Sequence, residues 1–176
     1  MAREEAASPL PVLLGFLVSG PAHPYELYQR FNRELGRVWR LGQSHLYAYL
    51  KRIEEEGLAK VEVEEQESRP ARNVYRLTSA GRKQFLEWLR KPSRHVRNIR
   101  LEFLARLYFF RALELEGQEE LVRAQKAVIE ERLATIERAM READDEYWRL
   151  VLDFRYSEMK AILAWLGRCS AKRSDF

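Results

Sequence analysis

Residues 41–82 read LGQSHLYAYLKRIEEEGLAKVEVEEQESRPARNVYRLTSAGR and decide the fold. Leu46, Leu50 and Ile53 recur at helical spacing in a segment that begins near Gln43 and stops at Gly57. A strand over 58–64, a polar loop and a strand over 73–77 follow, and Thr78 then caps another helix. This order of elements predicts a winged helix, which offers a helix and a loop to duplex DNA.

The helix over 43–57 is the expected groove-entering element. Its face opposite the apolar stripe carries small, polar and basic side chains, which suit the major groove. An exposed amphipathic helix is also a common solvated face, and Tyr47 has the alternative of packing half-buried against the first helix. The residues expected to reach bases or sugars, and then phosphates, are Ser44, His45, Tyr47 and Ala48, and then Lys51 and Arg52.

The loop between the two strands is the expected wing tip. In the run EQESRPAR, Arg69 and Arg72 flank Pro70, which stiffens the loop. Basic residues in a loop often serve only solubility. Beside a recognition helix, however, a stiff basic loop favours contact with phosphates or the minor groove.

The remaining pattern is helical. Expected helices before and after the wing cover 10–18, 24–36 and 79–90, and after Pro92 they cover 95–115, 118–147 and a segment ending near 166. We therefore expect a mainly α chain with a small β wing, of α+β class. Residues 1–92 form the expected winged helix-turn-helix DNA-binding domain, and residues 93–176 form the expected helical dimerisation domain.

Residues 129–147 carry a heptad pattern. Apolar residues recur with spacings of 4, 3, 4, 3 and 4 from Ile129 through Ala143 to Tyr147. Such a seam is typical of helix-to-helix packing, and we expect it to join two copies of the chain. The residues assigned to dimerisation are Ile129, Leu133, Ile136, Met140 and Tyr147.

Composition sets the other limits. The net charge of +4 and the pI of about 9.3 permit nucleic-acid binding without proving it. A single cysteine, Cys169, favours a reducing compartment, and the apolar run over 10–18 is too short to cross a bilayer, so we expect a cytoplasmic protein without membrane contact. His23, His45 and His95 lie far apart, and the chain has no phosphate-binding glycine loop or nucleophile elbow. Neither a metal, a cofactor nor an enzyme activity is therefore expected.

Three segments resemble the PadR family of transcriptional regulators: LLGFLVSGPAHPYELYQRF at 13–31, LGQSHLYAYLKRIEEEGL at 41–58 and SRPARNVYRLTSAGR at 68–82. The resemblance covers residues 10–90, and the helical remainder is similar in layout to the shorter-tailed branch. The chain departs from the family pattern at Pro24, where glycine is favoured, and at Ala48, where proline is favoured. It also has one extra residue between Gly42 and Leu46.

The resemblance implies a homodimeric, sequence-specific DNA-binding repressor acting on a pseudo-palindromic operator. It also implies a small hydrophobic or aromatic effector, for which Tyr147, Trp148 and Trp165 are the candidate lining, although large aromatics at helical spacing are more often plain packing. The alternative function is a winged-helix protein-interaction adaptor that does not bind DNA.

Overall fold

The computed structural model describes residues 7–66 and 69–169, with backbone only at 65, 66, 69 and 70. The chain divides into two compact units. The first contains the residues up to Lys91 together with Arg97–Leu115, and the second contains Pro92–Val96 and the residues from Glu116 onward. The boundary expected at residue 92 therefore differs from these units, because Arg97–Leu115 packs into the first of them.

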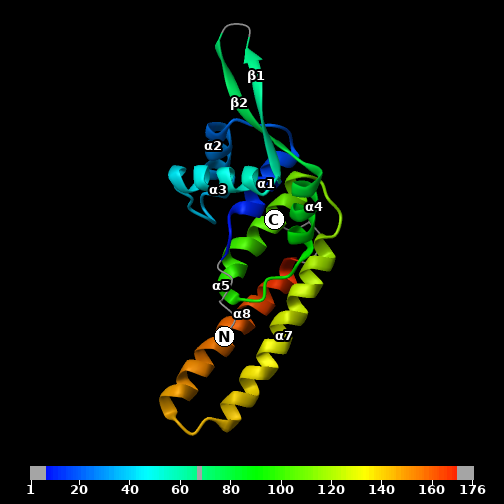
Figure 1. The fold of residues 1–176 in the computed structure, drawn as a ribbon. Coiled ribbons are helices and arrows are strands. Elements are labelled where there is room, and N and C mark those ends of the chain that lie inside the picture. The colour runs from blue at the N-terminus through cyan, green and yellow to red at the C-terminus, as the bar shows by residue number, and fades with distance from the viewer. Residues whose placement is uncertain (1–6, 67–68, 170–176) are drawn as a thin grey trace. The chain divides into compact units, whose positions relative to one another are not determined.

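The first unit has the element order of a winged helix (Figure 1). A two-stranded antiparallel hairpin follows three helices and precedes a fourth, so the mainly α fold with a small β wing is confirmed. The elements are α1 (Leu10–Val18), α2 (Pro24–Leu35), α3 (Gln43–Glu55), β1 (Ala59–Gln66), β2 (Arg69–Leu77), α4 (Ser79–Arg90), α5 (Val96–Asn98), the π-helical η1 (Ile99–Phe103) and α6 (Leu104–Ala112).

Helix α1 is the centre of this unit. Seven of its nine residues are buried, and it packs against α2, α3, α4 and β2. The Phe16 ring lies 6.1 Å from Phe31 and 5.3 Å from Phe109, and Phe109 lies 5.2 Å from Phe85, measured between ring centroids. These edge-on contacts join α6 to α1 and α4, which explains why residues after Pro92 return to the first unit.

The junction between α3, the wing and α4 depends on Thr78. Its hydroxyl lies 2.8 Å from the carbonyl oxygen of Gly57 and 3.0 Å from that of Leu58, and it accepts a hydrogen bond from Gly81 N–H. Gly57 has a φ of +67°, so it supplies the left-handed turn that ends α3. The Thr-x-x-Gly run at the start of α4 thus fixes that helix to the end of α3.

The second unit is a helical hairpin of α7 (Gln118–Glu142) and α8 (Glu146–Cys169), which pack side by side (Figure 1). Ile129 and Leu133 of α7 are buried, as are Leu152, Met159 and Leu166 of α8. The fully buried Gln125 side chain accepts a hydrogen bond from Ser93 N–H at 2.7 Å and donates one to Ser93 O at 2.9 Å. This amide holds the segment before α5 against α7.

Two helix predictions are wrong in their bounds. The helix expected over 118–147 ends at Glu142, so the heptad seam does not continue along one helix, and Tyr147 lies on α8 with 73% of its surface exposed. The single helix expected over 95–115 contains the π-helical turn η1 and ends at Ala112. Periodicity alone did not reveal these breaks, because apolar spacing continues across both of them.

Among the described residues, no helix is long and apolar enough to cross a membrane.

Candidate nucleic-acid interface

Helix α3 presents the face that the sequence predicted. Leu46, Leu50 and Ile53 are fully buried, and they hold the helix against α1 and α2. Ser44, His45 and Ala48 are exposed on the other side. Tyr47 keeps 42% of its surface exposed, so it is not sequestered against α1. The helix thus offers hydroxyl, imidazole, phenol and methyl groups to solvent from its first two turns.

The basic residues of α3 form ion pairs with acidic residues one helical turn further along. Lys51 lies 3.7 Å from Glu55, and Arg52 lies 2.6 Å from Glu56, with all four side chains well exposed. The hydrogen bond from Arg52 to Glu56 raises the pKa of Arg52 above its ordinary value, so the guanidinium stays charged. Exposed ion pairs of this kind contribute little to stability, so a DNA phosphate can replace the carboxylate.

The wing arginines lie elsewhere than predicted. Strand β2 begins at Arg69, four residues earlier than expected, so Arg72 is a strand residue rather than a loop residue. Arg72 is paired opposite Glu64 in the hairpin and donates to its carboxylate at 2.8 Å. It also donates to Glu26 at the start of α2. The side chain of Arg69 lies outside the described residues.

The two faces of the wing differ in character. One face carries the charged residues, among them Arg76, which donates to Glu62 at 2.6 Å. The other carries Val61 beside Tyr75, and then Val63, which is 68% exposed. Burial raises the pKa of Tyr75, and the nearby Glu54 and Tyr47 raise it as well, which places the base of this face beside α3.

Two exposed apolar side chains near this surface were not predicted as site residues. Tyr25 lies in the first turn of α2 and is 52% exposed, and Val63 lies in the middle of β1. The signal for Tyr25 was its place directly after Pro24, which opens the helix. Val63 could have been found from its alternation with Val61, because residues two apart on a strand lie on the same face.

Residues 13–87 match the family model described as the transcriptional regulator PadR-like family. The chain therefore carries a PadR-like domain over these residues. Residues 99–172 match a second model, described as the virulence activator alpha C-terminal region. PadR-like proteins are described as transcriptional regulators and not as enzymes.

The PadR-like chain is similar to two curated relatives. It is 26% identical over 113 residues to the negative transcriptional regulator PadR of Bacillus subtilis, covering 64% of this chain and 62% of that protein. It is 29% identical over 68 residues to a probable transcriptional regulator of Mycobacterium tuberculosis, covering 39% of this chain and 36% of that protein. The chain therefore spans less than two thirds of the length of either relative.

Among solved structures, the chain is similar to Bacillus subtilis PadR, crystallised in complex with operator DNA. The identity is 22%, with 93% of this chain and 97% of that chain covered, and the TM-score of 0.47 describes a loose overlap.

The candidate effector residues of this PadR-like chain do not meet within one copy. Tyr147 and Trp165 both lie on the continuous helix α8, eighteen residues apart, which corresponds to about 27 Å along the axis. Tyr147 and Trp148 are exposed by 73% and 45%. A small flat ligand cannot contact all three residues of one chain, and the pocket expected from the sequence is therefore not formed by these three side chains alone.

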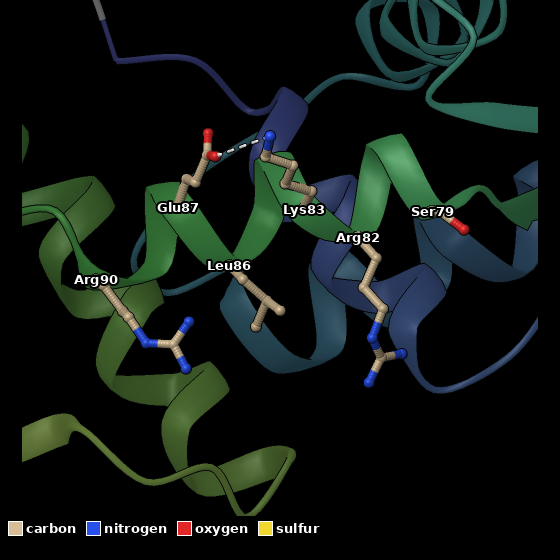
Figure 2. Close-up of a pocket in the computed structure, with 6 residues that line it drawn as sticks. All are labelled: Ser79, Arg82, Lys83, Leu86, Glu87 and Arg90. Atoms are coloured by element: carbon tan, nitrogen blue, oxygen red, sulfur yellow. Dashed lines mark ion pairs between the residues drawn. The ribbon is translucent and has the colours of Figure 1, made fainter.

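An open hollow of about 500 Å³ lies elsewhere, along α4 (Figure 2). It is bordered by residues of that single helix, so it does not enclose a ligand. Its borders are Ser79, Arg82, Lys83, Leu86, Glu87 and Arg90. Figure 2 shows Lys83 and Glu87 turned toward each other, and their charged atoms lie 4.0 Å apart.

Within the part of the chain that the structure describes, no group of three or more histidine, cysteine, aspartate or glutamate residues is arranged to hold a metal ion.

Proposed function

We propose that this protein is a sequence-specific DNA-binding transcriptional regulator that places α3 in the major groove. One observation carries the proposal: α3 buries a single apolar stripe and leaves an unobstructed face of small, polar and basic residues, within a PadR-like domain. Side chains from the first turns of such a helix reach base edges, and basic residues further along meet phosphates. A cytoplasmic location, where such a regulator meets its DNA, is part of the proposal.

The residues of α3 divide into two roles. Ser44 and His45 stand at its N-terminal end with hydrogen-bonding groups, so we assign them to base contacts, together with Tyr47 and Ala48. Lys51 and Arg52 lie further along the same exposed surface, and we assign them to phosphates. Arg69 remains a proposed phosphate or minor-groove contact of the wing.

This division is tested with two double variants in full-length protein. Lys51→Ala with Arg52→Ala is expected to weaken binding to all duplexes alike and to reduce the slope of log affinity against log salt by about 2. Ser44→Ala with His45→Ala is expected to leave the slope unchanged while reducing the preference for the selected duplex by about tenfold or more. Fluorescence anisotropy over a salt series measures both quantities, on a duplex selected by the wild-type protein from a randomised pool.

Lys83→Ala with Arg90→Ala, on the face of α4 bordering the open hollow, is the matched control. It removes the same charge from an exposed helix and is expected to change neither quantity. An equal effect of both basic double variants on the salt slope would contradict the assignment of α3.

We further propose a homodimer, with the second copy covering one face of α8. Ile129 and Leu133 from the predicted seam are buried within their own chain, whereas Ile136 and Met140 are only half-buried. The exposed apolar residues instead form a stripe on α8 at Tyr147, Leu150 and Phe154, exposed by 73%, 65% and 69%. Such a stripe at helical spacing suits a partner helix, and a two-fold dimer places its two α3 helices on a pseudo-palindromic operator, about 34 Å apart.

Charging this stripe is expected to separate the copies. Leu150→Glu with Phe154→Glu is expected to yield a monomer at micromolar concentration in sedimentation velocity, because two carboxylates cannot be buried against an apolar face without large cost. Lys160→Glu, an exposed change elsewhere on α8, is expected to leave the dimer intact. A dimer that survives the double change would show that another surface joins the copies.

Repression and relief by a small hydrophobic or aromatic effector complete the proposal. The curated name of the Bacillus subtilis relative, a negative transcriptional regulator, supports repression. An effector acts by binding one arrangement of the dimer more tightly than another. A ligand that contacts Tyr147 or Trp148 together with Trp165 requires these residues to come from two copies.

A further inference from the structure

Arg72 joins three elements of the first unit. From β2, its Nε donates to Oε2 of Glu64 on β1 at 2.8 Å, and its Nη1 donates to Oε1 of Glu26 on α2 at 2.5 Å. The side chain of Arg72 is 35% exposed, which is less than that of either carboxylate partner. The planar guanidinium therefore bridges the wing and the first turn of α2, which lysine with its single charged nitrogen does poorly.

Glu26 is a fixed partner because it also caps α2. Its Oε2 accepts a hydrogen bond from His23 N–H at 3.1 Å, which completes a capping box with the His23 side chain. The hydrogen bond from His23 lowers the pKa of Glu26 most strongly, and Arg72 lowers it further. One carboxylate oxygen thus serves the helix cap, and the other serves Arg72.

The bridge extends a backbone attachment further along the wing. At the base of β2, Tyr75 N–H donates to Ala22 O at 2.9 Å, and Ala22 N–H donates to Tyr75 O at 3.2 Å. Arg72 lies three residues nearer the tip, about 10 Å along the strand. Beyond it the pairing is irregular between Glu64 and Gln66, so Arg72 makes its two ion pairs where the regular ladder ends.

A second ion pair on the wing provides the comparison. Arg76 donates to Glu62 at 2.6 Å with the same chemistry, but both residues belong to the hairpin. That pair links β1 to β2 and does not reach a helix. The connection to α2 is therefore specific to Arg72.

We propose that Arg72 is a positioning residue that ties the wing to the start of α2 through Glu26 and Glu64 and so sets where the wing meets DNA. The inference rests on the proposed function for its role in DNA binding, and it replaces the sequence-based assignment of Arg72 to phosphate. In this role Arg72 keeps its carboxylate partners in the complex with DNA.

Glu26→Gln separates the two roles because they predict opposite signs. Glutamine still completes the capping box, but its second terminal atom is an NH2 group, which cannot accept a hydrogen bond from Arg72 as the second carboxylate oxygen does, and the negative charge is lost. If Arg72 contacted phosphate, freeing it would strengthen binding. If Arg72 is a positioning residue, losing its contact with Glu26 is expected to weaken specific binding about two- to fivefold, which is the scale of an exposed ion pair.

The same anisotropy assay then gives three further expectations. Arg72→Gln is expected to weaken binding as much as Glu26→Gln does. The double variant, Arg72→Gln with Glu26→Gln, is expected to weaken binding no more than either single variant. Arg76→Gln is expected to leave binding unchanged. A salt slope reduced by about 1 in Arg72→Gln, or tighter binding by Glu26→Gln, would overturn the proposal. Unchanged affinity in both single variants would overturn it equally.

Hydrogen–deuterium exchange of the free protein tests, without DNA, whether Arg72 and Glu26 hold the wing against α2. Peptides covering β2 are expected to exchange about two- to fivefold faster in Arg72→Gln and Glu26→Gln than in wild type, with no change in Arg76→Gln. If the wild-type protein selects no duplex, the proposed function fails, and the exchange result still decides whether Arg72 holds the wing. Unchanged exchange in Glu26→Gln would overturn the inference even if DNA binding is found.

Discussion

Replacing Arg106 with methionine is expected to cost about 3–5 kcal/mol of unfolding free energy, because it removes one partner of a buried ion pair. Arg106 is only 3% exposed. Its Nε donates to Trp88 O at 2.9 Å, and its Nη2 donates to Glu102 at 3.1 Å. The guanidinium also lies 4.6 Å from the centre of the Trp88 ring. Burial lowers the pKa of Arg106, and the ion pair with Glu102 opposes that effect.

Methionine matches the length of the arginine stem but donates no hydrogen bonds, so it leaves Glu102 charged and nearly buried without this partner. Adding Glu102→Leu to Arg106→Met is therefore expected to recover at least half of the loss, since an apolar pair replaces an ionic one. Urea unfolding followed by far-ultraviolet circular dichroism measures both values. A loss below about 1 kcal/mol in Arg106→Met would show that Arg106 does not hold α6 to α4.

Gly81→Ala is expected to destabilise the protein by about 2–3 kcal/mol, as overpacking against rigid neighbours does. A Cβ atom at this position would overlap the backbone carbonyl oxygen of Leu58, which cannot rotate away, and would lie 2.8 Å from Cδ1 of Leu77. The strain falls on the junction where Thr78 fastens α4 to the end of α3. The midpoint of urea unfolding is the measurement.

Gly167→Ala is the matched control for this change. Gly167 lies within α8, and an added Cβ meets nothing within 4 Å. Alanine is therefore expected to stabilise the helix by up to about 1 kcal/mol, through its better helix propensity. The same substitution thus has opposite signs at the two positions. Equal effects would contradict the packing described at Gly81.

Local pattern was sufficient to predict helices α1 to α4 and the exposed face of α3. Leu46, Leu50 and Ile53 are buried because residues three and four apart share one face of a helix, and the sequence shows that spacing directly. Gly57 and Thr78 mark the ends of their elements through their own backbone and side-chain chemistry. These features depend on residues close together in the chain.

The errors arose where distant residues decide the structure. No spacing in the sequence shows that Arg72 meets Glu26, 46 residues away. The division into units could not be predicted either, because it depends on Phe109 packing against Phe16 and Phe85. The heptad pattern correctly indicated helix packing at Ile129 and Leu133 but not that their partner is α8 of the same chain. Spacing identifies an apolar face, whereas its partner depends on tertiary structure.

The most direct test of DNA recognition by this chain compares two duplexes of the same length and composition. One carries the sequence selected by the wild-type protein from a randomised pool, and the other carries that sequence scrambled. At physiological salt, anisotropy titrations are expected to show at least about a thousandfold tighter binding to the selected duplex. Equal affinity for both, or no selected sequence at all, would contradict the account.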